Sequence, residues 1–402
     1  MKQPLSCYAY NPVNSFSTYG VVSGGGRADS SPYYSEANSH QVVSMAGAIS
    51  DLRVVFPTAP GAGTSWTVTL RVNGADSALT CTVAGTDTVG TDTTHSVDVV
   101  PGDLIAYKFV PSATPVTSRV ACSAFFTGGT AQESLILGTD SGGTVATAAV
   151  RSAPLMNSIQ AWSADPDYIY QLISTPGTLK NLYVKLSVDP GTSPDAYRFT
   201  IYINGSPSAI TVTITADATT GNDTTHTATV SAGDEVYLYC EPLEVPSASP
   251  YVNWGCGFVA DIDGESLLMF ASYSSPLVSP RYAPICTSDT WNTTEAGRLF
   301  RPHDCTLKKL YAKNRITLGA GSATFTLMEN AGASSLACTI TYPAQSANDT
   351  VNSVDIDSYN SVTMRCTFAG GANVNMPKFS LVAYIAPTGG EEAYVPKFMG
   401  II

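Results

Sequence analysis

Two short segments hold two of the four histidines, each beside an aspartate and threonines. Residues 91–95 read TDTTH and residues 222–226 read NDTTH. A histidine close to a carboxylate can supply half of a metal site, or the base and orienting acid of a catalytic pair. The same pattern also arises when a fold uses one strand entry more than once. The sequence therefore raises three hypotheses for His95 and His226: metal ligand, catalytic base or repeated structural residue.

The structural hypothesis explains the two histidines best. His95 precedes Val97 and Val99 in alternation, which predicts an inward-facing residue at the start of a strand, hydrogen-bonded to a loop carbonyl or a threonine. Aspartate followed by threonines is typical of turns. Asn352 stands at the corresponding place in a third segment and cannot replace a histidine ligand. We therefore assign no catalytic, metal or cofactor-binding residue, although one unit without a ligand does not exclude a site in the other two.

Other groups capable of chemistry also favour structural roles. The nine cysteines form no Cys-x-x-Cys pair, and most alternate with apolar residues, which is typical of buried reduced thiols. A disulfide within each unit stays open as the alternative. The glycine-rich segment 23–30 lacks the lysine of a P-loop, so we expect a flexible loop. Three Asp-x-Asp pairs are expected to be solvated turn carboxylates rather than calcium ligands. They are Asp165 with Asp167, Asp261 with Asp263, and Asp355 with Asp357.

Composition and charge narrow the classes of partner. Only 13% of the 402 residues are charged and the net charge is −12, which argues against sequence-independent binding to nucleic acid or to anionic lipid. No apolar run approaches the roughly eighteen residues that span a bilayer. The first residues, MKQPLSCYAYNPVNS, lack the apolar core of a secretory signal, so we expect no export. We thus predict a non-enzymatic protein without cofactor, nucleic-acid partner or membrane partner.

An internal repeat divides the chain. Stretches that begin at Asn73, Asn204 and Asn330 align without a gap through the following strand and turn: NGADSALTCTVAGTDTVGTDTTH, NGSPSAITVTITADATTGNDTTH and NAGASSLACTITYPAQSANDTVN. The sequence therefore predicts three related domains over residues 1–127, 128–261 and 262–387, followed by a tail over residues 388–402. Units this large can each bury a core of their own.

Within each unit apolar residues alternate with polar ones, which indicates strands with one buried face. The expected inward residues are Leu79, Cys81 and Val83; Ile210, Val212 and Ile214; and Leu336, Cys338 and Ile340. About eight strands and no helix are expected in each unit, with tight turns at Asn73-Gly74 and Asn204-Gly205. The fold class is therefore all-β, as three tandem antiparallel β-sandwiches. Jelly-roll wiring is the first expectation and an immunoglobulin-like order stays open.

The hairpin entries TVTLRVNG and FTIYING, the TDTTH and NDTTH segments, and the strand entries VVPGDLIAYKF and VSAGDEVYLYC resemble the small jelly-roll modules of the tumour-necrosis-factor and C1q type. Such modules recur in head fibres, decoration proteins and tail appendages of tailed phages. The third unit departs from the pattern, because it lacks both the Asn-Gly and the Gly-Asp turns. The resemblance covers most of the chain, and because such modules commonly form trimers, it implies that three in one chain can close a pseudo-threefold ring.

The resemblance also suggests a function. We expect a virion structural protein, either a capsid decoration or a fibre component, synthesised in the host cytoplasm. Its partners would be other virion proteins, such as major capsid or tail subunits, and self-association is open. The alternative is a receptor- or carbohydrate-binding tail appendage, in which exposed tyrosines stack on sugar rings. The tail, TGGEEAYVPKFMGII, would dock on a partner subunit, and its deletion would release the protein from its particle.

Overall fold

A computed structural model describes residues 2–27, 35–140, 143–158, 162–272, 274–275, 280–357 and 359–387. The predicted tail at 388–402 lies outside these residues. The described part is all-β, apart from three 3-10 turns of three residues each, and the prediction of an all-β fold is confirmed. No helix in this part has the length and apolar character needed to cross a bilayer.

The first ten strands form two sheets, which we call the first sandwich. One sheet has the order β3-β1-β10-β5-β8, and the other has the order β2-β9-β6-β7 with β4 paired to β9. The chain passes from one sheet to the other between most successive strands, and this is jelly-roll wiring rather than an immunoglobulin-like order. The strands are β1 Lys2–Tyr10, β2 Thr18–Gly20, β3 Gly24–Arg27, β4 Gln41–Val42, β5 Gly47–Val55, β6 Gly61–Val72, β7 Ala75–Gly85, β8 Val89–Val99, β9 Leu104–Ser112 and β10 Val120–Gly128; the 3-10 turn η1 is Glu36–Asn38.

Strands β11 to β19 form the second sandwich in the same manner. Its sheets have the orders β11-β19-β14-β17 and β12-β18-β15-β16, with β13 paired to β18. The strands are β11 Glu133–Thr139, β12 Arg151–Ala153, β13 Gln171–Leu172, β14 Gly177–Leu186, β15 Ala196–Ile203, β16 Ser206–Thr215, β17 Thr220–Val230, β18 Glu235–Leu243 and β19 Val252–Ala260; η2 is Pro166–Tyr168.

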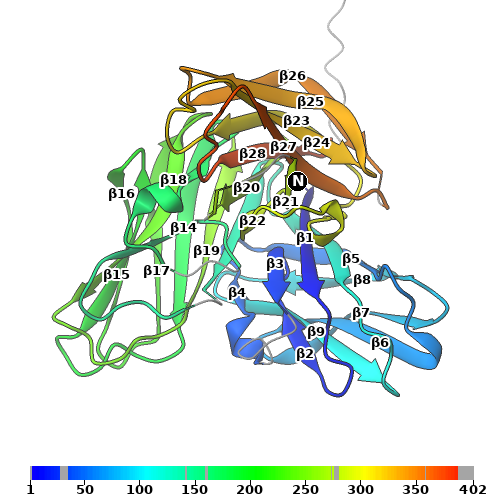
Figure 1. Ribbon diagram of the computed structural model, residues 1–402. Coiled ribbons are helices and arrows are strands. Elements are labelled where there is room, and N and C mark those ends of the chain that lie inside the picture. Colours follow the sequence, from blue (N-terminus) through cyan, green and yellow to red (C-terminus); the bar gives the residue numbers. More distant parts are fainter. Residues whose placement is uncertain are drawn as a thin grey trace, which may run out of the picture.

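Strands β20 to β28 form the third sandwich, with sheets β22-β20-β28-β23-β26 and β21-β27-β24-β25. The strands are β20 Glu265–Ser272, β21 Arg281–Ala283, β22 Thr287–Asp289, β23 Cys305–Lys313, β24 Ser322–Glu329, β25 Gly332–Thr341, β26 Ser346–Ile356, β27 Val362–Ala369 and β28 Lys378–Tyr384; η3 is Glu295–Gly297. Figure 1 shows the three sandwiches as blue to cyan, green, and yellow to red lobes. Among the named strands of the described residues, pairing is antiparallel except that β1 with β3 and β20 with β22 are parallel, and a single parallel bridge joins Gly138 of β11 to Asn157.

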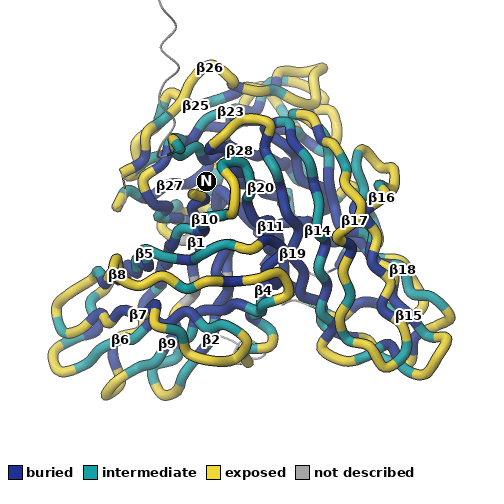
Figure 2. Tube along the Cα trace, turned by 180° about the vertical axis from the view of Figure 1, so that it is seen from behind, coloured by how far each residue is buried: buried dark blue, intermediate teal, exposed yellow. Residues whose placement is uncertain are grey.

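The predicted inward residues do form the cores. All nine residues named for the strands that follow Asn73, Asn204 and Asn330 are buried, from Leu79, Cys81 and Val83 onward. Figure 2 shows buried positions running through all three lobes, with exposed positions mainly at turns and on outer strands. The hairpin turns also form as expected, with φ of 51° at Asn73 and 79° at Gly74. The third hairpin keeps this geometry without a glycine, since Ala331 adopts a φ of 64°.

The glycine-rich segment was predicted to be a flexible loop, and this is wrong for residues 24–27, which form β3. β3 pairs in parallel with β1, so that Cys7 lies opposite Gly24. A Cβ atom at Gly24 would lie 2.8 Å from Ser158 Oγ, and one at Gly25 would lie 2.7 Å from the ring of Tyr8. The glycines therefore permit close packing between chain segments.

The sandwiches contact one another in cyclic order at equivalent places. The segment after β4 lies on the second sandwich, where Asn181 Nδ2 donates to the carbonyl of Ser44 at 3.4 Å. The segment after β13 lies on the third, where Lys309 Nζ donates to Thr175 Oγ1 at 3.1 Å. The segment before β23 returns to the first, where His303 Nε2 donates to the carbonyl of Asp51 at 2.6 Å.

The three residues that receive these segments occupy the same bulge of β5, β14 and β23. Asp51, Asn181 and Lys309 have φ values of 56°, 54° and 53°, respectively. The contacts thus repeat around the molecule, which is not the arrangement of three units strung in a line.

Chain segments from all three sandwiches also meet at the centre. Gly25 N donates to Ser158 Oγ at 2.8 Å, and Ser158 Oγ lies 2.6 Å from Thr287 Oγ1. Ser288 donates to Asn157 Oδ1. Small, buried polar residues therefore connect the lobes where β3 and β22 approach each other.

Candidate functional site

The two histidines of the repeated pentapeptides lie inside long strands, β8 and β17, and not at turns. β8 carries a bulge here: Ser50 pairs with Ser96 and Leu52 pairs with Asp92, so the residues between them have no partner on β5. The extra residues shift the alternation of faces. The side chain of Asp92 is 5% exposed while that of His95 is 54% exposed. The predictions of a turn and of an inward histidine are therefore wrong, and the buried residue is the aspartate.

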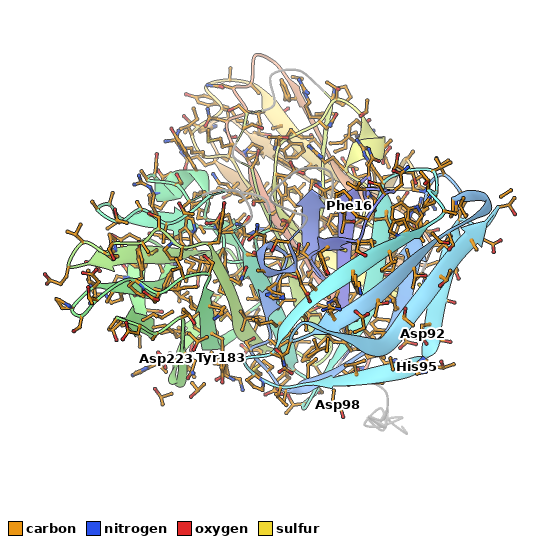
Figure 3. The ribbon with its side chains drawn as sticks, turned by 90° about the horizontal axis from the view of Figure 1, so that it is seen from below. Phe16, Asp92, His95, Asp98, Tyr183 and Asp223 are labelled. Atoms are coloured by element: carbon orange, nitrogen blue, oxygen red, sulfur yellow. The ribbon has the colours of Figure 1, made fainter. Side chains whose placement is uncertain are left out.

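Each bulge is held by its aspartate. Asp92 Oδ1 accepts hydrogen bonds from the backbone N–H groups of Thr94 and His95, both at 3.1 Å, and Oδ2 accepts one from Thr80 N at 3.0 Å. The His95 ring adds a contact from Nδ1 to Oδ2 at 2.9 Å. Asp223 and His226 repeat this arrangement, again with 2.9 Å between Nδ1 and Oδ2. Figure 3 labels Asp92, His95 and Asp223.

The third sandwich explains why histidine and asparagine can exchange at this position. Asp349 accepts from the backbone N–H groups of Val351 and Asn352, and Asn352 Nδ2 donates to Asp349 Oδ2 at 2.9 Å. The amide nitrogen thus reaches the oxygen that the imidazole Nδ1 reaches in the other sandwiches. Burial alone would raise the pKa of these aspartates, but the hydrogen bonds outweigh it and lower the pKa of Asp223 to about 2.

This geometry does not form a catalytic triad. In a triad one ring nitrogen of the histidine faces the acid and the other faces the nucleophile. Here the same nitrogen of His95, Nδ1, lies 3.2 Å from Thr94 Oγ1 and 2.9 Å from Asp92. Among the described residues no three His, Cys, Asp or Glu side chains are grouped so as to hold a metal ion. The contacts of Asp92 and His95 therefore support a structural role, in which they hold the backbone bulge.

Replacement of both histidines by asparagine should therefore change the free energy of unfolding by less than about 0.5 kcal/mol. Asp223→Ala should lower it by about 1–3 kcal/mol, because buried backbone N–H groups lose their hydrogen-bond acceptor. Because the folded pKa of Asp223 lies below its unfolded value, its contribution is complete above about pH 4 and is lost as the pH falls toward 2. Urea unfolding of His95→Asn/His226→Asn and of Asp223→Ala at pH 7 and pH 3 measures this. A double-asparagine variant as unstable as Asp223→Ala would contradict it.

The cysteines are all buried and free of disulfides. Burial raises the pKa of the thiols of Cys81, Cys256, Cys305 and Cys338 to about 12, so they stay protonated and unreactive at neutral pH. Cys7 and Cys122 lie directly opposite each other on β1 and β10. The alternative of a disulfide within each sandwich is not what the structure contains.

The aspartates of each Asp-x-Asp pair act separately rather than as a joint ligand set. Asp165 caps η2 through the N–H of Asp167 at 3.0 Å and pairs with Arg315 of the third sandwich at 3.1 Å. Asp355 accepts from Thr306 Oγ1 at 2.6 Å. Asp261 and Asp263 are exposed at the turn before β20.

Sequence reasoning missed the buried charges of the third sandwich. Glu265 is fully buried, with Lys308 Nζ at 2.9 Å and Lys309 Nζ at 2.8 Å. Asp289 pairs with Arg298 at 3.2 Å, and both side chains are almost fully buried. The signal available in the sequence was the carboxylate of Glu265, which stands two residues before the apolar run LLMFA. Such a run indicates a strand that is buried on both faces.

Comparison with known proteins adds no relative. No protein-family model matches the chain, and no curated protein matches it in sequence. The fold by itself defines the class: an all-β protein of antiparallel sandwiches with jelly-roll wiring.

Proposed function

We propose that the chain is a non-enzymatic structural protein of a tailed-phage particle, a capsid decoration or fibre component, which binds other virion proteins. The observation that carries this proposal is the cyclic set of contacts among three similar sandwiches. A ring of three jelly-roll modules in one chain is a covalent counterpart of the trimers that such modules commonly form. On this interpretation the chain is a pseudo-trimer.

Burial between the sandwiches supports a permanent ring. Leu135 and Leu137 of β11 pack into the core of the first sandwich. Tyr8 of β1 packs with the core of the second and third, and its ring meets that of Phe300 edge-on with 5.3 Å between centroids. Each first strand is therefore buried on both faces, as in an obligate interface.

The surface supports a particle-exposed role. Pairs of threonines on neighbouring strands join their hydroxyls on the outward face of the hairpin in each sandwich, as in Thr67 with Thr82 at 2.9 Å and Thr200 with Thr211 at 2.6 Å. Thr324 and Thr339 do the same at 2.9 Å in the third sandwich. These hydroxyls make the face polar, and charges on it are paired, as in Arg198 with Glu241, which suits close packing on neighbouring subunits.

Copy number tests the proposal. Purified particles that contain this protein should carry tens to hundreds of copies in a decoration role, measured by quantitative mass spectrometry against the major shell protein. A few copies per particle would favour the tail-appendage alternative. Absence from purified particles would overturn the proposal.

A further inference from the structure

The repeat makes the three borders between sandwiches directly comparable. Each border brings the turn before β9, β18 or β27 against the strand β14, β23 or β5 of the next sandwich. On the turn side Gly102 and Leu104 correspond to Gly233 and Glu235, and to Tyr359 and Ser361. On the strand side Tyr183 and Lys185 correspond to Tyr311 and Lys313, and to Arg53 and Val55.

Side chains fill the border between the second and third sandwiches. Glu235 forms an ion pair with Lys313 across it. Lys313 Nζ also lies 5.7 Å from the ring centre of Tyr170. Tyr311 packs against the cluster that contains Tyr170 and Tyr237.

The border between the third and first sandwiches is filled differently. Tyr359 places its ring 4.5 Å from the guanidinium of Arg53. Arg301 donates to the carbonyl of Tyr359 and holds the turn in place. Here an aromatic side chain occupies the position of Gly102.

The border between the first and second sandwiches is open. A groove of about 370 Å³ lies between Gly102 and Leu104 on one side and Tyr183, Lys185 and Asn222 on the other. A Cβ atom at Gly102 would already lie 3.9 Å from the ring of Tyr183, so the glycine leaves the space that Tyr359 fills elsewhere. Figure 3 shows Tyr183 where the second sandwich meets the first.

The groove carries the positive charge of Lys185. Lys185 Nζ donates to Thr219 Oγ1 at 2.8 Å, and within the described residues no carboxylate lies at ion-pair distance from it. Leu104 stands where Glu235 neutralises Lys313. The nearby carboxylate of Asp103 is held at its own turn by Val100 N at 2.8 Å and Asn73 Nδ2 at 2.7 Å.

We propose that this groove binds an acidic sugar residue, of the uronic acid type, within a polysaccharide. The ring of Tyr183 offers an apolar face to a sugar ring, and Lys185 supplies the cation for its carboxylate. Asn222, exposed at the rim, offers an amide to the hydroxyls. The volume falls in the range of small-ligand sites, roughly 300–1,000 Å³. The proposal does not depend on a role in a phage particle.

The test compares D-glucuronate with D-glucose, which differ at the carboxylate, on the full chain by saturation-transfer NMR and calorimetry. We expect glucuronate to bind in preference to glucose by about tenfold, and Lys185→Gln to remove that preference. Lys180→Gln is the matched control, because Lys180 lies on the same strand but pairs with Glu133 at 3.0 Å. Tyr183→Ala should weaken both sugars.

A second variant copies the filled border. Leu104→Glu should pair with Lys185, as Glu235 pairs with Lys313, and should abolish glucuronate binding, whereas Leu104→Gln should retain it. Both should melt close to the parent temperature, since the second sandwich carries glutamate at this position. Equal binding of glucose and glucuronate, unchanged binding by Leu104→Glu, or no binding of either sugar would overturn the proposal.

Discussion

Asp289→Ala is expected to lower the free energy of unfolding by about 3–5 kcal/mol, because it removes the carboxylate that pairs with the buried guanidinium of Arg298. The guanidinium lies 3.2 Å from Asp289 Oδ1, with about 5% of either side chain exposed. Arg298 also donates from Nε to the carbonyl of Thr290 at 3.1 Å, so it cannot turn toward solvent without losing that bond. Urea unfolding at pH 7 measures the change.

The same site tests whether the ring is closed in solution. The hydroxyl of Tyr8, on the first strand of the chain, donates to Asp289 Oδ2 in the third sandwich. Tyr8→Phe should cost about 1.5–3 kcal/mol, as expected for a hydrogen bond to a charged group. A double-mutant cycle on Tyr8→Phe and Asp289→Ala should give a coupling energy above about 0.5 kcal/mol. Additive effects would mean that Tyr8 and Asp289 do not interact, and would contradict this contact between the first and third sandwiches.

Lys378→Met is expected to stabilise the protein by about 1–4 kcal/mol at pH 6, because it removes a buried charge for which no carboxylate of the described residues lies at ion-pair distance. Lys378 is fully buried in β28; its Nζ donates to the carbonyl of Asp167 at 2.6 Å and lies 4.4 Å from the ring centre of Tyr170. Burial, followed by the positive charge of Arg315, lowers the pKa of Lys378 to about 7.

The pH dependence follows from that pKa. An unfolded lysine titrates near roughly 10.4, so between pH 7 and 10 the unfolded chain binds more protons than the folded one, and stability attributable to Lys378 should rise with pH. Burial raises the pKa of Tyr170 beyond this window, so that ring does not obscure the effect. Thermal unfolding from pH 6 to pH 10 should show the stability of the parent rising relative to that of Lys378→Met, since the buried thiols titrate alike in both proteins and cancel in the comparison.

The second sandwich supplies a matched control. Asn253 occupies the position of Lys378, and its Nδ2 donates to the carbonyl of Ala37 at 3.3 Å, as Lys378 donates to that of Asp167. Lys378→Asn keeps a donor and removes the charge, so it should abolish the pH dependence as well. A stability difference between the parent and Lys378→Met that stays constant over this range would refute the buried-charge interpretation.

The contact between sandwiches leaves a signal in the sequence that differs from the alternation of apolar and polar residues. The runs ESLILG and ESLLMFA, which become β11 and β20, are apolar at consecutive positions. Consecutive apolar residues put hydrophobic side chains on both faces of a strand, and both strands are in fact almost wholly buried. The runs thus indicate that a second layer covers β11 and β20, although they do not identify the strands of that layer.

The bulged strands show the limit of periodicity. A strand was predicted to begin at His95, after a turn and with His95 facing inward, but β8 already begins at Val89 and its bulge moves His95 to the outer face. One inserted residue exchanges the two faces of a strand, and a sequence pattern read at a fixed period of two cannot locate it. Asp92, the buried acceptor that holds the bulge, was therefore taken for part of a turn.

By itself the sequence determined the repeat, the all-β class, the inward residues of the hairpins and the tight turns at Asn73-Gly74 and Asn204-Gly205, because these depend on side-chain alternation and on local backbone preference. Only the tertiary structure decided which polar groups are buried and how the sandwiches meet. Tyr8 with Asp289, and Asp51 with His303, join residues more than half the chain apart. Such contacts leave no local period in the sequence, since each depends on the packing of whole sandwiches rather than on the residues beside it.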